Sequence, residues 1–530
     1  MESIISRWRE KRAKERAKVA PDPVEGEPGS VGSSSAGAMA FHILGFIAAA
    51  LVTIPFGERG VWPVAARTGA IALVWIVAWP ALRFAARERS RSARTVAVEQ
   101  LLIVLPALLT VAVATLAFGY APLRDFLNSL PLMKNVPMSE ARLMLADSAP
   151  VSLAALAAVL LFGRGTCAVV GAMSAMMMAI CSDFRLQPLA MGFAATMIFM
   201  HRGRRVSSRS KARRLSFRAA VALCAVTLVF IATHKPFSWD AAIVRVIGAA
   251  VSAIAGALVS LALLPLLESL SGAYSNITLN SFADLEHPLL RDLRYKASGT
   301  FAHSDRVSLL ASAAAEAIGA DVILARVIGY YHDIGKLAKP EYFTENSNGG
   351  PNPHDTLSPN VSRMIIASHI KEGVVIGRKY HLPPPVLDAI HQHHGNSIMR
   401  SFYGKALRQD PQMDLPGMTQ SETVDPNSFR YDSKRPSTRE IAILMLADIA
   451  EAALRSMPGL SKEDVPAKID SLIASVIADG QLDDCPLKFS ELRDIRKALA
   501  VTYIGISHTR VAYPDQNSDN KVQNTDQKQS

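Results

Sequence analysis

Cysteine is scarce in this sequence, with four residues among 530. The four are Cys167, Cys181, Cys224 and Cys485; three of them lie inside apolar runs, and none forms a close pair with another. A disulfide framework needs paired cysteines, and a zinc ribbon needs cysteines a few residues apart. Both are therefore excluded, and we expect all four to be packing residues.

The sequence also lacks a P-loop and a nucleophile elbow. The first would cradle the phosphates of a nucleotide, and the second would present a catalytic serine. Any hydrolytic chemistry must therefore come from another set of groups.

Charge is nearly absent from long stretches of the first half of the chain. A helix that spans a bilayer needs about 20 apolar residues. Eight candidates meet or approach this length: Ala38–Phe56, Val61–Leu82, Glu99–Tyr120, Pro150–Phe162, Thr166–Cys181, Leu186–Met200, Ala219–Thr233 and Ala241–Leu266. The fourth to sixth are short or closely spaced, so seven or eight spans are expected. Buried helices of a soluble protein do not account for so many consecutive uncharged runs.

The net charge of +11 is concentrated beside these runs. Lys and Arg cluster in Met1–Ala36 (seven), Arg83–Arg94 (five) and His201–Arg218 (eight). This pattern is typical of the cytoplasmic flanks of membrane spans, and not of a groove that reads a nucleic-acid polymer with interleaved aromatics. With the N-terminus inside, the inner segments hold 21 Lys and Arg and the outer loops hold 6. The rule that inner loops are positive therefore predicts a cytoplasmic N-terminus and, after an even number of spans, a cytoplasmic C-terminal half.

These patterns predict an all-α protein in five segments. The expected segments are a basic cytoplasmic tail and linker (1–37), a polytopic transmembrane domain (38–266), a linker region with helices (267–300), a cytoplasmic all-helical domain (301–514) and a disordered polar tail (515–530). The basic start precedes a Pro/Gly/Ser-rich linker and no apolar core follows it directly, so we do not expect a cleaved signal peptide.

Histidine is concentrated in one part of the C-terminal half. Eight of the thirteen histidines lie between His303 and His394. One of them, His332, stands beside Asp333 in the helical, largely apolar run "VIGYYHDIGK". A buried imidazole next to a buried carboxylate is costly unless something compensates it, and a metal ion is the obvious candidate. Further along, Asp448 lies in another apolar helical run, with Glu451 one turn later.

The histidine segments have helical periodicity and are separated by Gly, Pro and Asn breaks. Helical proteins build metal sites from ligands on separate helices that point inward. A mixed His/Asp set of this size exceeds what one ion needs, whereas two ions that share Asp333 would use it well. The sequence therefore favours a site for two divalent cations.

An ordered set of motifs resembles the HD-domain phosphohydrolases, and in particular the seven-transmembrane HD family that includes cyclic-di-AMP phosphodiesterases. The supporting stretches are "HPLLRDL", "GTFAHS", "ARVIGYYHDIGK", "PEYFTEN", "NPHDTLSP", "QHHG", "FRYDSKRP", "MLADIAEAALRS" and "DGQLDDCPL". The likeness is dense from Ala283 to Pro514 and looser across the spans.

The resemblance implies a ligand role for seven residues. One ion would be held by His303, His332, Asp333 and Asp448. The other would be held by His369, His393 and His394, with Asp333 as the bridge. Asp333 and Lys336 would be the catalytic residues, and Lys336 would face a substrate phosphate. His354, His381 and His391 have no ligand role in the family's pattern.

The resemblance also implies a function. It predicts a metal-dependent phosphodiesterase in the inner membrane of a bacterium that uses two Mn or Fe ions to convert cyclic di-AMP into pApA on the cytoplasmic side. Two alternatives stay open: an enzyme of the same class acting on another nucleotide, and a nucleotide-binding receptor with an inactive HD domain. The cyclic-di-GMP branch carries Gly-Tyr-Pro after its histidine pair; this chain reads "HHGNSIMRSFYG". The expected partners are a cyclic dinucleotide and the lipid bilayer, and a homo-oligomer is compatible with the sequence.

Two features depart from the family. Many relatives carry a large extracellular domain after the first span, whereas only short loops leave the membrane here, the longest being Ala121–Ser148. The second feature is Lys405–Ser428, a polar stretch between His394 and "FRYDSKRP". A lid and a surface loop are the two alternatives for it, and we expect the surface loop.

Overall fold

The computed structural model describes residue 66 and residues 68–76, 93–119, 125, 129, 150–182, 185–203, 206–233, 239–347, 350–409, 424–457 and 459–507. The chain divides into two compact units, and the boundary falls between Ser281 and Phe282. Several expectations lie outside the described residues: the basic tail at 1–37, the span Ala38–Phe56, nearly all of the loop Ala121–Ser148 and the tail at 515–530.

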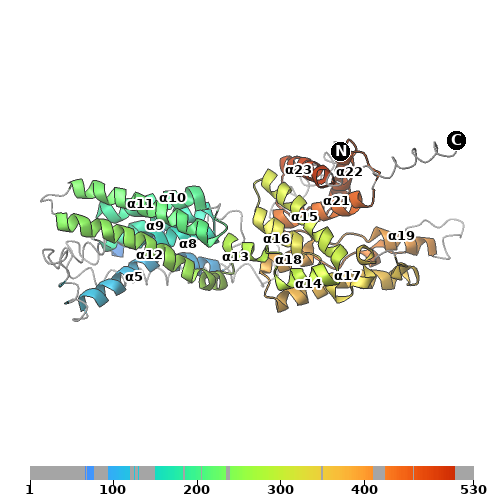
Figure 1. Cartoon of the computed structure of the whole chain (residues 1–530), viewed down its shortest axis with the longest axis horizontal. Coiled ribbons are helices and arrows are strands. Elements are labelled where there is room, and N and C mark those ends of the chain that lie inside the picture. Colours follow the sequence, from blue (N-terminus) through green and yellow to red (C-terminus); the bar gives the residue numbers. More distant parts are fainter. Residues whose placement is uncertain are drawn as a thin grey trace, which may run out of the picture. The chain divides into compact units, whose positions relative to one another are not determined.

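The N-terminal unit consists of helices packed on one another (Figure 1). Its helices are α5 (Ala93–Gly119), α8 (Val151–Leu161), α9 (Arg164–Cys181), α10 (Leu186–Arg202), α11 (Arg209–Thr233) and α12 (Trp239–Ser271), after which α13 (Asn276–Phe282) follows. Residues 68–76 are helical as well. The third to eighth expected spans each fall on one of the six long helices, and part of the second falls on residues 68–76.

Helix α8 lies at the centre of this unit. Every described side chain from Ser152 to Leu161 is buried, and the helix packs against α5, α9, α10 and α12. At about 1.5 Å of rise per residue, its 11 residues cover roughly half of the ~30 Å hydrocarbon core. The Ser152 hydroxyl donates to the Ala253 carbonyl of α12, and the Ser260 hydroxyl donates to the Leu153 carbonyl. Helix α8 is therefore enclosed by protein along its whole described length.

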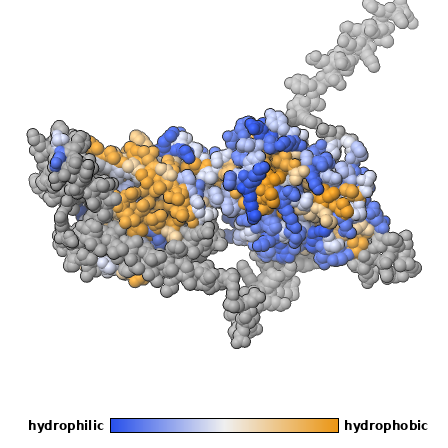
Figure 2. Space-filling model, turned by 90° about the horizontal axis from the view of Figure 1, so that it is seen from below, coloured by the Kyte–Doolittle hydropathy of each residue, from blue (hydrophilic) through white to orange (hydrophobic). Residues whose placement is uncertain are grey.

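Apolar side chains are exposed on described helices of the N-terminal unit. On α11 and α12, Phe217, Val229 and Val251 are each exposed by 60% or more. Figure 2 shows this apolar surface in orange on the described part of the unit. Three helices, α9, α11 and α12, are long and apolar enough to cross a membrane by length and composition. Such a surface is suited to lipid and not to water, and the chain is a membrane protein.

The C-terminal unit is built from helices and short 3-10 turns. These are α14 (Pro288–Lys296), α15 (Ser298–Ala317), α16 (Val322–Tyr331), η2 (Ile334–Ala338), η3 (Pro340–Tyr342), η4 (Thr344–Asn346), η5 (Pro353–Asp355), α17 (Pro359–Lys379), α18 (Pro384–Gln392), α19 (Arg400–Gln409), η7 (Pro426–Phe429), α21 (Arg439–Arg455), α22 (Val465–Ala478) and α23 (Phe489–Ser507). The described residues contain no β-strand, only an isolated bridge between Ile398 and Arg430. The prediction of an all-α fold is confirmed.

Side-chain caps begin the helices that carry the polar landmarks. Asp321 accepts from the N–H groups of Ile323 and Leu324 at the start of α16. Ser358 caps α17 and Thr438 caps α21 in the same way. Such caps satisfy backbone donors that have no partner inside the helix. The start of each of these helices is thereby fixed by the sequence itself.

The apolar core of the C-terminal unit gathers around α21, whose side chains from Ile441 to Ala447 are all buried. Helices α15, α16, α18 and α22 contribute to the same core, as do Leu289 and Leu290 of α14. Helix α14 lies in the region that the sequence analysis treats as a linker, yet it belongs to this unit, which begins at Phe282. Of the polar stretch expected as a loop, Lys405 to Gln409 instead complete α19, and residues 410–423 lie outside the described part.

Candidate metal centre

The His332-Asp333 pair stands where α16 ends and η2 begins. His332 is the C-cap of α16, and Asp333 is the residue from which η2 starts. Gly335 brings this turn against α17, because a Cβ at Gly335 would come within 1.8 Å of the His369 carbonyl oxygen. Only glycine allows so close an approach. The turn is thereby held next to the helix that carries His369.

Four side chains form a first group. The Asp333 Oδ2 atom lies 3.7 Å from His303 Nε2 and 3.3 Å from His332 Nε2. The Asp448 Oδ1 atom lies 3.0 Å from His303 Nε2 and 3.8 Å from His332 Nε2. The residues come from α15, from the end of α16 and from α21. Three of them, His303, His332 and Asp333, could hold a metal ion by the spacing of their donor atoms, and Asp448 adjoins them.

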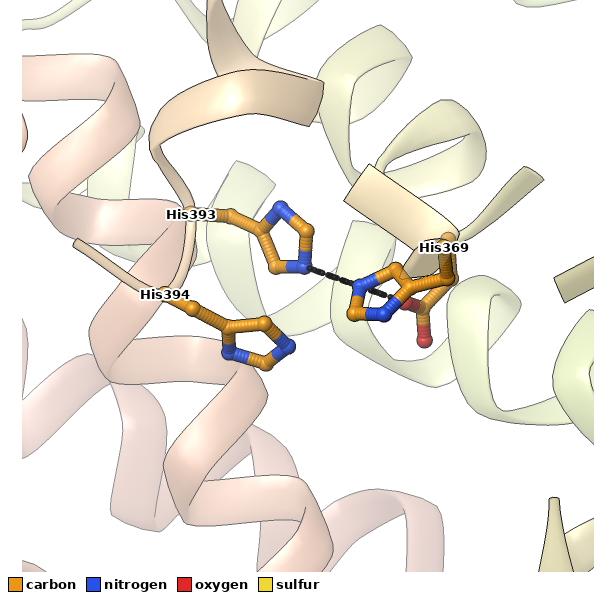
Figure 3. Close-up of side chains that lie close together, drawn as sticks. His369, His393 and His394 are labelled. Carbon is orange, nitrogen blue, oxygen red and sulfur yellow. Dashed lines mark hydrogen bonds and ion pairs between the residues drawn. The ribbon is translucent and has the colours of Figure 1, made fainter. Parts of the chain in front are cut away.

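A second group shares Asp333 with the first. Its other members are His369 of α17 and the pair His393-His394, which follows α18. Figure 3 shows the three imidazoles converging, with His369 and His393 joined by a dashed line. The Asp333 Oδ1 atom lies 3.5 Å from His369 Nε2 and 3.8 Å from His393 Nε2. The structure therefore brings together all seven residues that the sequence analysis selects, with one carboxylate facing both groups.

Backbone hydrogen bonds orient three of the histidines. The Nδ1 atoms of His332, His369 and His393 lie 2.6 to 2.9 Å from the carbonyl oxygen three residues earlier in the chain. An imidazole that donates its Nδ1–H leaves a lone pair on Nε2. The Nε2 atoms of His369 and His393 face each other at 3.3 Å, so two lone pairs meet there. A cation between them would turn this repulsion into ligation.

The protonation of the second group suits metal binding. Burial lowers the pKa of His369 and His393 below its usual range and lowers the pKa of His394 to about 3. Burial alone would raise the pKa of Asp333, but Lys336 and then His332 hold it well below its usual value. These three histidines are neutral and the carboxylate is ionised at neutral pH, as ligands must be.

Two buried atoms of the candidate metal ligands are left without a hydrogen bond. Among the described residues, His332 Nε2 and Asp333 Oδ1 have no hydrogen-bond partner. Buried polar atoms almost always have one, so an orphaned pair needs an explanation. Imidazole nitrogens and carboxylate oxygens are the donors preferred by divalent transition metals. The residues present therefore fit a site for divalent cations.

Lys336 lies at the edge of this cluster. Its Nζ atom is 2.8 Å from Asp333 Oδ2 and 2.7 Å from Glu345 Oε1, and its ammonium group lies over the Phe343 ring. Burial opposes the charge of Lys336, yet Asp333 and Glu345 outweigh it and raise the pKa of the amine above its usual value. Glu345 also accepts from the Thr300 hydroxyl. Glu345 was not among the predicted site residues, because it stands in a three-residue turn where no helical periodicity marks it.

A second network fixes the turn after His394. Gly395 has a positive φ of 56°, which glycine adopts without strain. The Gln481 side chain accepts from the Asn396 N–H and donates to the Asn396 side chain. Arg430 donates to the Asn396 carbonyl and pairs with Asp479 at 2.9 Å. Residues from "FRYDSKRP" and "DGQLDD" thus hold the histidine pair in place.

The remaining histidines of the cluster in the sequence lie outside both groups. His354 is buried, with its Nε2 atom 2.9 Å from the Tyr342 carbonyl oxygen. His381 is exposed and has a positive φ of 54°, just after α17 ends.

Tyr431 lies next to His394 and stacks on its imidazole, with ring centroids 4.4 Å apart. Tyr431 belongs to the motif "FRYDSKRP", but nothing in the sequence distinguished it as a residue of the site.

Two family models match the chain in succession. The model described as "7TM receptor with intracellular HD hydrolase" matches residues 61–275, and the model "HD domain" matches residues 300–453. All seven residues of the cluster lie within the second match.

The curated relatives include two proteins named Cyclic-di-AMP phosphodiesterase PgpH. The one from Bacillus subtilis is 40% identical over 50% of this chain, and the one from Listeria monocytogenes is 40% identical over 48% of it. The chain spans about a third of their length, 36% and 34%. A crystal structure of the L. monocytogenes PgpH HD domain in complex with cyclic-di-AMP has 40% sequence identity and a TM-score of 0.38, and the match covers 42% of this chain and 99% of that one.

The two family matches follow each other in the order that the sequence analysis expects, a membrane part and then an HD domain. Together with the relatives, they show that over these two stretches the chain is similar to the seven-transmembrane receptors with an intracellular HD hydrolase domain.

Proposed function

We propose that this chain is a membrane-anchored, metal-dependent phosphodiesterase that hydrolyses cyclic di-AMP to pApA on the cytoplasmic side of the membrane. One observation carries the proposal: two groups of histidine and aspartate side chains share the carboxylate of Asp333. Two cations held side by side in this way are typical of hydrolytic sites that act on phosphate esters.

The seven residues have separate roles in this proposal. His303, His332 and Asp448 would hold one ion and His369, His393 and His394 the other, with Asp333 between them. When bound, the cations would supply a Lewis acid for the phosphodiester and a nucleophile from water at neutral pH. Manganese or iron suits a set that mixes imidazole with carboxylate. His369, His393 and His394 are neutral and Asp333 is ionised, so these donors are ready without a prior loss of protons. Asp448 and Glu451 outweigh burial and raise the pKa of His303 to about 9, so an ion bound there would displace a proton.

Lys336 would bind a non-bridging phosphate oxygen. Its ammonium group lies at the edge of the cluster, where it pairs with both Asp333 and Glu345. A fixed positive charge stabilises the charge that develops on the phosphate in the transition state. Glu345 would keep the amine charged and in place.

The choice of cyclic di-AMP rests on the relatives. Both PgpH proteins carry this substrate in their names, and the matched structure is titled as a complex with it. The Gly-Tyr-Pro of the cyclic-di-GMP branch is missing after His393-His394. Adenine is therefore the base we expect at this site.

The membrane arrangement in the proposal follows the charge pattern. We place residues 38–266 in the inner membrane of a bacterium and residues 301–514, the HD domain, in the cytoplasm. The 21 Lys and Arg of the inner segments, against 6 outside, support this orientation. The substrate would then be an intracellular nucleotide.

The experiment that tests the proposal uses the full chain in detergent, loaded with Mn²⁺. Cyclic di-AMP and cyclic di-GMP are supplied separately, and the products are resolved by chromatography. Conversion of cyclic di-AMP to pApA with little turnover of cyclic di-GMP is the expected result. Two bound ions per chain without cleavage of either would contradict it and would favour another nucleotide or a receptor that only binds.

Lys336→Met offers a sharper prediction for the edge of the site. Loss of one fixed donor to a phosphate typically lowers kcat by about 100- to 1,000-fold. We expect a loss of this size, with the number of bound Mn²⁺ ions unchanged because Lys336 is not a ligand. Steady-state kinetics and metal analysis measure the two quantities.

Lys371→Met is the matched control, because the Lys371 side chain is exposed and its ion pair with Asp432 is long, at 3.9 Å, and exposed as well. It should behave as the unaltered protein. If Lys336→Met lost an ion, or kept kcat within tenfold, a phosphate-binding role for Lys336 would be wrong.

A further inference from the structure

His303 is oriented differently from three of the other histidines of the cluster, His332, His369 and His393. These three bind the carbonyl oxygen of their own helix through Nδ1. The Nδ1 atom of His303 instead lies 2.5 Å from the Oε2 atom of Glu451, which is 148 residues away in the chain and outside the seven candidate ligands. Its orientation therefore depends on a side chain that can be exchanged without altering a ligand.

Glu451 is a fully buried acid on α21. Its Oε1 atom accepts from Arg306 Nε at 2.6 Å, and Arg455 Nε lies 3.4 Å from its Oε2 atom. Both arginines are partly exposed, whereas the Glu451 side chain has no exposed surface. A buried carboxylate is costly unless it is paired. Here the two arginines and His303 share its charge.

Glu451 and Asp448 hold His303 from both sides. They lie three residues apart on α21, so they face the same side of the helix. Asp448 Oδ1 lies 3.0 Å from Nε2 of the imidazole, and Glu451 lies against Nδ1. The ring can neither flip nor rotate without losing one of the two contacts.

We propose that Glu451 is a positioning residue: it fixes the tautomer and direction of His303, and thereby sets the affinity of the ion held by His303, His332 and Asp448 but not that of the ion held by His369, His393 and His394. The inference rests on the proposed two-ion site. A carboxylate that accepts the second N–H of a ligand histidine raises the basicity of that ligand, and its loss typically weakens metal binding by about 10- to 100-fold.

The contact also has a purely structural reading, in which Glu451 only pairs the two arginines. That reading predicts a general loss of stability that weakens both ions together. Selective weakening of one ion distinguishes the two, because the backbone carbonyls that orient His369 and His393 do not touch Glu451.

The test is calorimetric titration of Mn²⁺ into the metal-stripped full chain in detergent, with Glu451→Gln. The amide keeps the shape of the side chain but loses its charge. One ion of the two is expected to bind about 10- to 100-fold more weakly, and the other is expected to keep its affinity. Glu463→Gln, which removes an exposed carboxylate of the same unit, is the matched control and should leave both affinities unchanged.

Arg306→Gln is the second variant, in case Glu451→Gln does not fold. It leaves the contact between Glu451 and His303 and removes one charge that holds the carboxylate, so a smaller effect on the same ion is expected. Equal weakening of both ions, or no weakening of either, in a folded variant would overturn the inference. Failure of the unaltered chain to bind two ions would contradict the proposed function itself. Two ions in the unaltered chain, with no selective weakening in the variants, would contradict only the role of Glu451.

Discussion

Asp333→Ala is expected to abolish hydrolysis, with a loss of more than about 1,000-fold, while the protein still inserts into the membrane. The reason is that each oxygen of this carboxylate faces a different group: Oδ2 faces His303 and His332, and Oδ1 faces His369 and His393. Alanine would remove a ligand from both of the proposed ions at once, whereas loss of a single fixed contact to a reacting phosphate typically costs about 100- to 1,000-fold. Turnover of cyclic di-AMP and the content of bound Mn²⁺ measure the effect.

The chain supplies its own control for this substitution. His354-Asp355 is a second His-Asp pair, and its aspartate is exposed and lies outside both groups. Asp355→Ala should keep its turnover and its two ions. Membrane insertion is followed for both variants by extraction with detergent and with alkaline carbonate. Activity of Asp333→Ala within tenfold of the unaltered protein would rule out the shared carboxylate.

Gly335→Ala is expected to have the second largest effect, here on stability. A Cβ at this position would lie 1.8 Å from the His369 carbonyl oxygen and 2.6 Å from the backbone nitrogen of Gly373, and neither can move as a flexible side chain does. The turn that carries Asp333 would have to separate from α17. Overpacking costs typically about 1 to 3 kcal/mol, and contact with two backbone groups of α17 places this case at or above the upper end.

Scanning calorimetry of the full chain measures the change, and Mn²⁺ titration shows whether the group that contains His369 is weakened as well. Gly505→Ala is the matched control: Gly505 lies in α23 with nothing within 4 Å of an added Cβ. It should be neutral or raise stability by up to about 1 kcal/mol, because alanine favours a helix over glycine. Equal melting of the two variants would show that the contact between Gly335 and α17 is not tight.

The candidate ligands could be predicted because they break a pattern. His332-Asp333 and Asp448 are polar residues inside apolar helical runs, where burial requires compensation. Their order along the chain then matched a known family, and the structure brings all seven residues together. Most of the helices at the expected spans could also be predicted from the sequence. A sufficiently long uncharged run predicts a helix even when the segments that pack against it are unknown.

The residues around the ligands could not be predicted, because they are defined by contacts between distant segments. Glu345 meets Lys336 from a three-residue turn, and Gln481 meets Asn396 across 85 residues. Neither stands out in its own stretch of sequence, where exposed polar residues are common. Glu451 was visible one turn after Asp448, but its contact with His303 depends on the packing of α15 against α21.

The ligands come from five separate stretches of the chain, between His303 on α15 and Asp448 on α21. A bound ion would therefore fasten helices that are far apart in sequence, as a crosslink does, and its binding free energy would add to that of folding. At a free concentration one hundred times the Kd, one ion contributes about 2.7 kcal/mol. A cell short of the metal would thus hold a less stable protein as well as a less active one, and proteases would lower its abundance. The amount of the enzyme would then follow the supply of its cofactor without any change in gene expression.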